Sequence, residues 1–76
     1  MKGKLPRVTA VKVIKALERV GFSLARQSGS HKIYENKEGK RVTIPYHVGR
    51  TLHPKVLTSI LRDADMSYEE LKELMK

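Results

Sequence analysis

The sequence contains no cysteine, and this absence removes three kinds of chemistry at once. A chain without thiols forms no disulfide, no thiolate-ligated zinc site and no cysteine nucleophile. Long apolar runs are missing too, since no stretch approaches the roughly 20 residues that a membrane span needs. Pro6, Arg7, Lys12 and Lys15 interrupt every N-terminal stretch that could act as a signal peptide. We therefore expect a cytoplasmic protein with no membrane partner, whose stability comes from packing.

Acidic residues are scarce as well. Eight Asp and Glu stand against 16 Lys and Arg, which gives a formal net charge of +8. Fourteen of the basic residues, but only Glu18, Glu35 and Glu38 among the acids, lie in residues 1–62. A basic field of this kind suits a polyanionic partner, and nucleic acid is the prediction. Surplus lysine can also serve solubility alone, so the charge by itself does not decide between this role and nucleic-acid binding.

The length of 76 residues allows one small domain, which we predict to span residues 1–76. Apolar residues from Ala10 to Val20 recur at helical spacing, and Thr9 precedes them as a plausible N-cap. Gly21 can take the left-handed position that ends a helix, and Phe22 would then pack back on the last turn. The first helix is therefore predicted with both of its ends.

The centre of the chain predicts a three-stranded antiparallel sheet. Two short alternating segments begin at Phe22 and near Ile33 and flank a turn at Ser28-Gly29, and a third segment follows over residues 41–45. Pro54 at a first helical position opens a second helix, which ends near Asp65. Residues 67–70 read as a capping box that opens a short third helix. The prediction is an α+β fold, α-β-β-β-α, with both main helices on one sheet face, the other face solvated, and a C-terminal helix.

Three histidines could carry protons near neutral pH: His31, His47 and His53. His31 is set between a tight turn and Lys32, where a cation would help to bind phosphate, although a lone strand histidine is more often structural. Neither His47 nor His53 has a nearby acid or cysteine to complete a familiar set of metal ligands, so no metal site is predicted. Arg50 and the helix N-terminus that Pro54 opens could together receive a phosphate.

Three segments form a fairly specific combination: the helix end Val20–Phe22, the stretch Arg26–Tyr34 (RQSGSHKIY) and the stretch Val42–His47 (VTIPYH). Together they resemble HicA, the small toxin family of HicAB toxin–antitoxin systems, over nearly the whole chain. The resemblance implies a fold like that of double-stranded-RNA-binding domains, endoribonuclease activity on mRNA, and inhibition by a HicB-type antitoxin. It also implies that His31 is the catalytic histidine. The chain departs from the family at Asp65, where members often carry glycine.

The chemistry of RNA cleavage agrees with this assignment. Attack by the RNA's own 2′-OH needs a base for that proton, cations for the phosphate and a donor for the leaving 5′-oxygen, and it requires neither metal nor other cofactor. His31 is the candidate base. Candidate RNA-binding residues are Arg26, Ser30, Lys32, Arg50 and Lys55, and candidate auxiliary groups are Tyr34 and His47.

Tyr34 and His47 each have a second interpretation, and one alternative function fits the same fold. Counting by two along the strand puts Tyr34 on the opposite face from His31, and His47 could simply serve the turn after Pro45. The alternative function is a non-catalytic RNA-binding module of the same fold. The second helix carries only Lys55 and Arg62, without the dense lysine cluster of such modules, and this disfavours a purely binding role.

Overall fold

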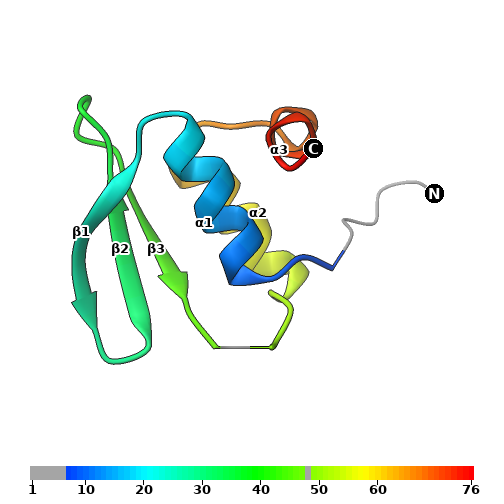
Figure 1. Cartoon of the computed structure of the whole chain (residues 1–76), viewed down its shortest axis with the longest axis horizontal. Helices are drawn as coiled ribbons and strands as arrows, with labels where there is room; N and C mark the ends of the chain where they lie inside the picture. The colour runs from blue at the N-terminus through cyan, green and yellow to red at the C-terminus, as the bar shows by residue number, and fades with distance from the viewer. Residues whose placement is uncertain (1–6, 48) are drawn as a thin grey trace.

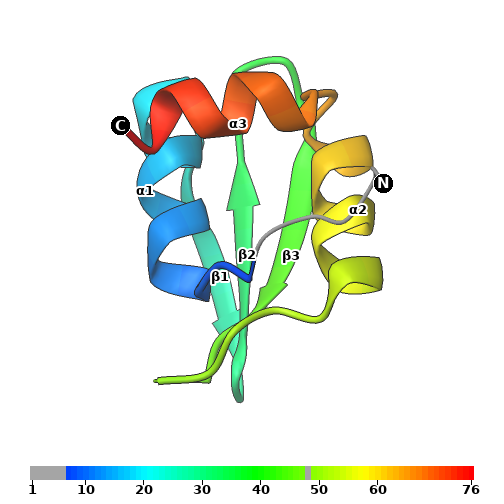
Figure 2. The same cartoon turned by 90° about the vertical axis from the view of Figure 1, so that its right-hand side faces the viewer.

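The computed structural model describes residues 7–47 and 49–76, so Pro6 lies outside the described residues. The elements follow in the order α1 (Ala10–Arg19), β1 (Ser23–Ser28), β2 (His31–Glu35), β3 (Arg41–Pro45), α2 (Pro54–Asp63) and α3 (Tyr68–Leu74). The strands form one antiparallel sheet in the order β1-β2-β3. Helices α1 and α2 lie on one face of this sheet (Figure 1). Helix α3 runs across the top of both helices in Figure 2. The predicted α+β architecture is confirmed. Within the described part of the chain, no helix has the length and apolarity of a membrane span.

The ends of α1 form as the sequence predicts. The Thr9 hydroxyl accepts a hydrogen bond from the backbone N–H of Lys12, and Thr9 is the N-cap. At the other end the N–H of Phe22 donates to the carbonyl of Leu17 at 3.0 Å, while Gly21 adopts φ +99°. This is a Schellman motif, and it turns the buried Phe22 back onto the helix.

A second Schellman motif joins α2 to α3. The N–H of Met66 donates to the carbonyl of Leu61 at 2.9 Å, and the N–H of Asp65 donates to that of Arg62 at 3.1 Å. Asp65 has φ +56°, in the left-handed region that favours glycine. Ser67 then opens α3 with the predicted capping box.

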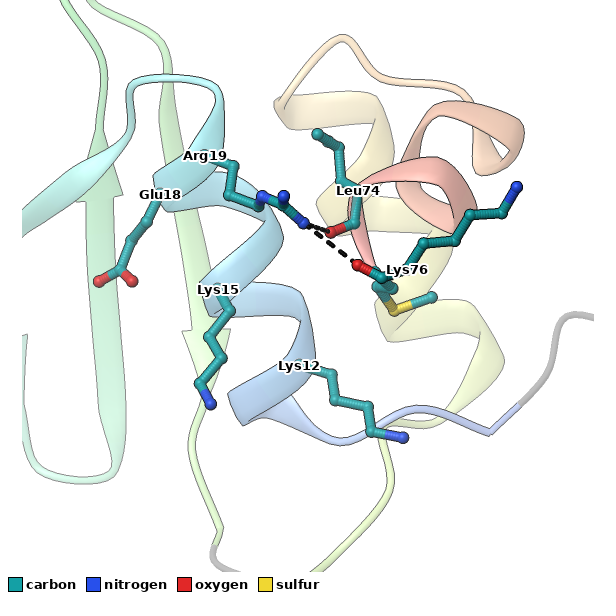
Figure 3. A pocket seen from close by; sticks show the side chains of 7 residues that line it. Lys12, Lys15, Glu18, Arg19, Leu74 and Lys76 are labelled. Carbon is teal, nitrogen blue, oxygen red and sulfur yellow. Dashed lines mark hydrogen bonds between the residues drawn. The ribbon is translucent and has the colours of Figure 1, made fainter.

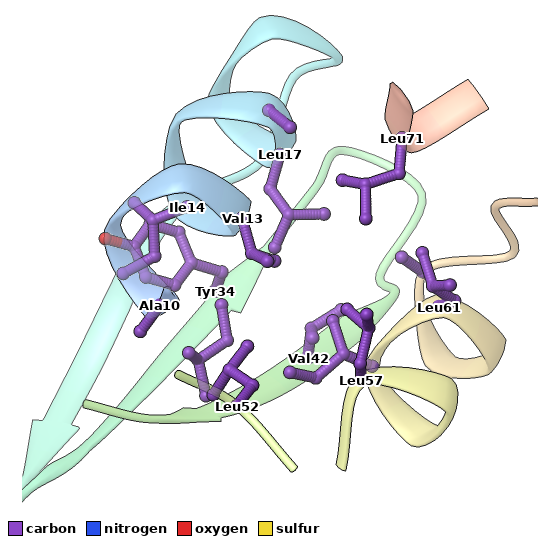
Figure 4. Close-up of a cluster of buried hydrophobic side chains, with 14 of the residues drawn as sticks. Ala10, Val13, Ile14, Leu17, Tyr34, Val42, Leu52, Leu57, Leu61 and Leu71 are labelled. Atoms are coloured by element: carbon purple, nitrogen blue, oxygen red, sulfur yellow. The ribbon is translucent and has the colours of Figure 1, made fainter. Parts of the chain in front are cut away.

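The core lies between the sheet and the three helices (Figure 4). Val42 and Ile44 of β3 and Tyr34 of β2 face the helices, and each is buried. All six residues of β1 are exposed, and Leu24 keeps 48% of its surface. The simple alternation of buried and exposed residues expected from Phe22 onward is therefore wrong for this strand. Phe22 is buried before the strand begins, and the strand itself contains an irregularity in its pairing.

Candidate functional site

Two segments that are distant in the sequence meet at one end of the sheet, the lower end in Figure 1: the β1–β2 turn and the chain that leaves β3. The backbone N–H of Tyr46 donates to the carbonyl of Ser30 at 2.6 Å and ties the two together. His31 and His47 each stand next to one member of this pair. The structure therefore brings both histidines to the same end of the sheet.

His31 is the first residue of β2, and its side chain is exposed. Its cross-strand partners are Ser28 on β1 and Pro45 on β3. Because side chains alternate along a strand, His31 lies on the face opposite to the buried Tyr34. Both main helices cover the Tyr34 face, so the imidazole stands on the uncovered outer face, where a large substrate can reach it (Figure 1).

Arg26 shares this outer face with His31. Its partner across the strands is Ile33, two residues beyond His31 on the same side of β2. Strict alternation would put Arg26 on the same face as Leu24, but the register shifts between these two residues, which leaves Ala25 as an extra residue. Such a bulge re-aims the side chains that flank it. Leu24 pairs with Tyr34 on the helix side, and Arg26 joins His31 on the outer side.

Lys32 lies on the other face of the sheet. It pairs with the buried Ile44 and is itself half-buried. Its ammonium nitrogen sits 4.0 Å from the centre of the Tyr46 ring, a cation–π contact. The sequence ranks Arg26 and Lys32 equally, whereas the structure separates them by face. Sequence reasoning missed Tyr46, because this contact depends on the strand register.

The N-terminal end of α2 supplies further cations. Arg50 and Lys55 are both exposed, and the N–H of Arg50 donates to the carbonyl of His47 at 3.2 Å. His53 is the N-cap of α2, since its Nδ1 accepts the N–H of Lys55 at 3.1 Å. This N–H, one of those expected to face a phosphate, is therefore already bonded. A short bridge between Thr9 and Thr51 holds the end of the loop against the segment before α1.

Tyr34 and His47 differ in their access to solvent. Tyr34 is only 4% exposed and lies beside α1, with Ala10 and Ile14 close to it in Figure 4. Burial, and next the negative charge of Glu18, raise the pKa of its hydroxyl above 10.0. We therefore give Tyr34 a packing role and leave it out of the site. His47 is exposed at the same end as His31.

The chain matches a family of toxins over most of its length. A family model described as the HicA toxin of bacterial toxin–antitoxin matches residues 10–66, which include every residue of the site described above. No curated protein matches the chain. In residues 7–47 and 49–76 no three His, Cys, Asp or Glu side chains are grouped so that they could hold a metal ion.

Proposed function

Because this chain belongs to the HicA family of toxins from bacterial toxin–antitoxin systems, we propose that it is an endoribonuclease that cleaves mRNA with His31 as general base. The observation that carries this proposal is the outer sheet face. There an exposed histidine and an arginine share one face, which none of the helices in residues 7–47 and 49–76 covers. General bases are most often histidines, and phosphate is most often bound by arginine or lysine.

Each residue would have a defined part in the reaction. The neutral His31 imidazole takes the proton of a ribose 2′-OH, and the 2′-oxygen attacks the adjacent phosphorus. The bond from phosphorus to the 5′-oxygen breaks, and that oxygen takes a proton as it leaves. The products are a 2′,3′-cyclic phosphate and a free 5′-hydroxyl. A positioned base contributes typically about 10²- to 10⁴-fold to such a step. His47, exposed at the same end of the sheet, is our candidate for the proton donor.

The cations divide between the reacting phosphate and its neighbours. Arg26 shares the face of His31, so we assign its guanidinium to the reacting phosphate. Ser30 lies in the β1–β2 turn, Arg50 in the loop after β3 and Lys55 in the first turn of α2; all three are exposed and would hold the flanking RNA backbone. Lys32 is on the other side of the sheet, where only RNA that bends around the end of the strands would reach it.

Inhibition follows from the same exposed face. A HicB-type antitoxin would place an acidic surface over His31 and Arg26, in the position that RNA otherwise takes. Binding of RNA and binding of the antitoxin at this face would then exclude each other. A stable complex of all three that still cleaves RNA would refute this part of the proposal.

The decisive experiment incubates a long mRNA with wild type, His31→Ala, Arg26→Ala and Lys32→Ala in EDTA, with each fold checked by circular dichroism. We expect His31→Ala to be folded and inactive. Loss of one charge-assisted phosphate contact costs roughly 1.5–3 kcal/mol, so Arg26→Ala should lower kcat/KM roughly 10- to 150-fold. Lys32→Ala removes the same charge from the other face and should change kcat/KM much less.

Two outcomes would overturn the assignment of His31 as the base of a nuclease, and a third would overturn the division of the cations. Undiminished cleavage by His31→Ala would remove the histidine from the mechanism. Retention of RNA by wild type and variant alike, with no cutting by either, would favour the non-catalytic RNA-binding module. Equal losses in Arg26→Ala and Lys32→Ala would refute the division of the cations between the two faces.

A further inference from the structure

A second basic surface lies among the helices, away from the sheet. Residues of α1 and the end of α3 line a pocket of about 490 Å³. Its cations are Lys12, Lys15, Arg19 and Lys76. In Figure 3 the side chain of Arg19 extends from α1 to α3, and that of Lys12 extends to the same side of α1, away from the strands. We call this pocket the α1–α3 groove. None of the residues assigned to RNA lines it.

The charge of the α1–α3 groove is poorly neutralised. Among the described residues, Lys12, Lys15 and Arg19 form no ion pair with an Asp or Glu side chain, while Lys76 pairs with Glu73 at 3.0 Å. Glu18 is the acid that lines the groove, and in Figure 3 its carboxylate extends toward the strands instead. This position agrees with its effect on the pKa of Tyr34. The groove therefore favours an anionic occupant.

One of these cations is held in place. A terminal guanidinium nitrogen of Arg19 donates to the carbonyl of Leu74 at 2.7 Å and, more weakly, to that of Lys76 at 3.4 Å. The Leu74 carbonyl lies at the end of α3, where the helix leaves acceptors without an internal partner, and Lys76 follows two residues later. The bonds fix α1 against α3, so the groove is formed before any partner arrives. A preformed site loses less conformational entropy when it binds.

The wall supplied by α3 is apolar. Leu74 and Met75 are half-buried, pack against the core and line the groove beside the cations. An RNA backbone carries phosphates and ribose, and it offers no apolar side chain to pack against this wall. A protein segment with carboxylates and an apolar side chain uses both parts, and methionine adapts readily to such a side chain.

We infer that the α1–α3 groove docks an acidic segment of the antitoxin, which inserts an apolar side chain against Leu74 and Met75 while its carboxylates meet Lys12, Lys15 and Arg19. The inference rests on family membership, which supplies the antitoxin partner, and not on the proposed cleavage of RNA. The groove is separate from the outer sheet face. This contact therefore adds to the one proposed over His31 and Arg26, and it uses a surface to which no RNA contact is assigned.

Lys12→Glu is the test variant, because this substitution should leave helix α1 and its N-cap intact. Lys12 lies in the first turn of α1, which holds no acid, and a carboxylate there suits the helix dipole. The Thr9 cap is made to the backbone of residue 12 and is kept. Lys37→Glu is the matched control, since this exposed lysine lies in the turn between β2 and β3 and undergoes the same change of charge. Both are made in the His31→Ala chain, so that RNA is not cut.

Two dissociation constants are measured for each variant. Calorimetric titration gives the Kd of the purified antitoxin, and fluorescence anisotropy gives the Kd of a labelled single-stranded RNA. Reversing a charge that meets a carboxylate costs roughly 1.5 kcal/mol or more, so we expect antitoxin binding to weaken at least about tenfold in Lys12→Glu. Lys37→Glu should change it by no more than about twofold. The two variants should weaken RNA binding equally.

An unchanged antitoxin Kd in Lys12→Glu would overturn the inference. So would a selective loss of RNA binding with antitoxin binding intact, since the α1–α3 groove would then belong to RNA. If the wild-type chain fails to cleave RNA while Lys12→Glu still loses the antitoxin, the proposed nuclease function fails and the docking groove stands.

Discussion

Leu71 attaches α3 to the rest of the molecule, and its truncation tests how firmly. It is the buried residue of α3 and is 0% exposed. Leu71→Ala removes three carbon groups from the core, worth about 2.4 kcal/mol in transfer alone at about 0.8 kcal/mol each. The cavity left behind raises the expected loss of unfolding free energy to roughly 2.5–5 kcal/mol. For a domain of this size the lower figure corresponds to a fall in Tm of roughly 10–20 °C.

Leu24→Ala is the matched control, since it is the same truncation at a leucine that is 48% exposed. We expect this variant to lose less than about 1 kcal/mol. Urea unfolding followed by circular dichroism measures both variants at 25 °C. A loss below about 1 kcal/mol in Leu71→Ala, or equal losses in the two variants, would show that α3 does not depend on this side chain. The preformed α1–α3 groove would then lack its support.

Three further predictions concern single contacts. His53→Ala removes the acceptor for the Lys55 N–H and should lower the unfolding free energy by about 1 kcal/mol, whereas His53→Asn should not; equal thermal midpoints would contradict the cap. The Lys40 ammonium, 2.9 Å from Asp65, lowers the pKa of that carboxyl from its usual 3.8. This ion pair therefore stabilises the folded state fully above pH 3.8, and the stabilisation is lost as the pH falls below that value. Urea midpoints measured from about pH 5 to pH 2 should therefore fall more steeply for wild type than for Asp65→Asn, and parallel curves would refute the pair. Burial raises the pKa of Tyr34 above 10.0, so the unfolded chain ionises first and stability is lost as the pH rises through that region; Tyr34→Phe should lack this loss in unfolding measured at about pH 9 and pH 11, and an identical loss in both would place its cause elsewhere.

The helix ends were predictable because their signals are local. Thr9, Gly21 and Ser67 act on backbone groups within a few residues of themselves, and the structure forms each of those bonds. Pro54 likewise stands at the start of α2. The alternation along β3 was equally clear, since Val42 and Ile44 are buried on one face while Arg41 and Thr43 are exposed on the other. Together with the turn at Ser28-Gly29, these local features gave the order of the helices and strands.

Asp65 shows how a local rule can be met by an unexpected residue. The backbone at Asp65 is left-handed, with φ +56°, a conformation that favours glycine. Aspartate tolerates this conformation better than most residues, and its carboxylate gains the Lys40 ammonium as a partner. That partner comes from the turn before β3, so the sequence around Asp65 could not reveal it.

Sequence periodicity could not predict which side chains of β1 lie on the outer face of the sheet. Counting by two from Leu24 puts Arg26 under the helices, yet counting back from the Ser28–His31 pair puts it beside the histidine. The second count gives the face that Arg26 takes in the structure, because the extra residue Ala25 interrupts the alternation between Leu24 and Arg26. The bulge thus lets β1 keep Leu24 toward the helices while it presents a guanidinium on the face of His31. If the proposed cleavage is correct, the unpaired residue of this strand has a function: it places the cation where the reacting phosphate would lie.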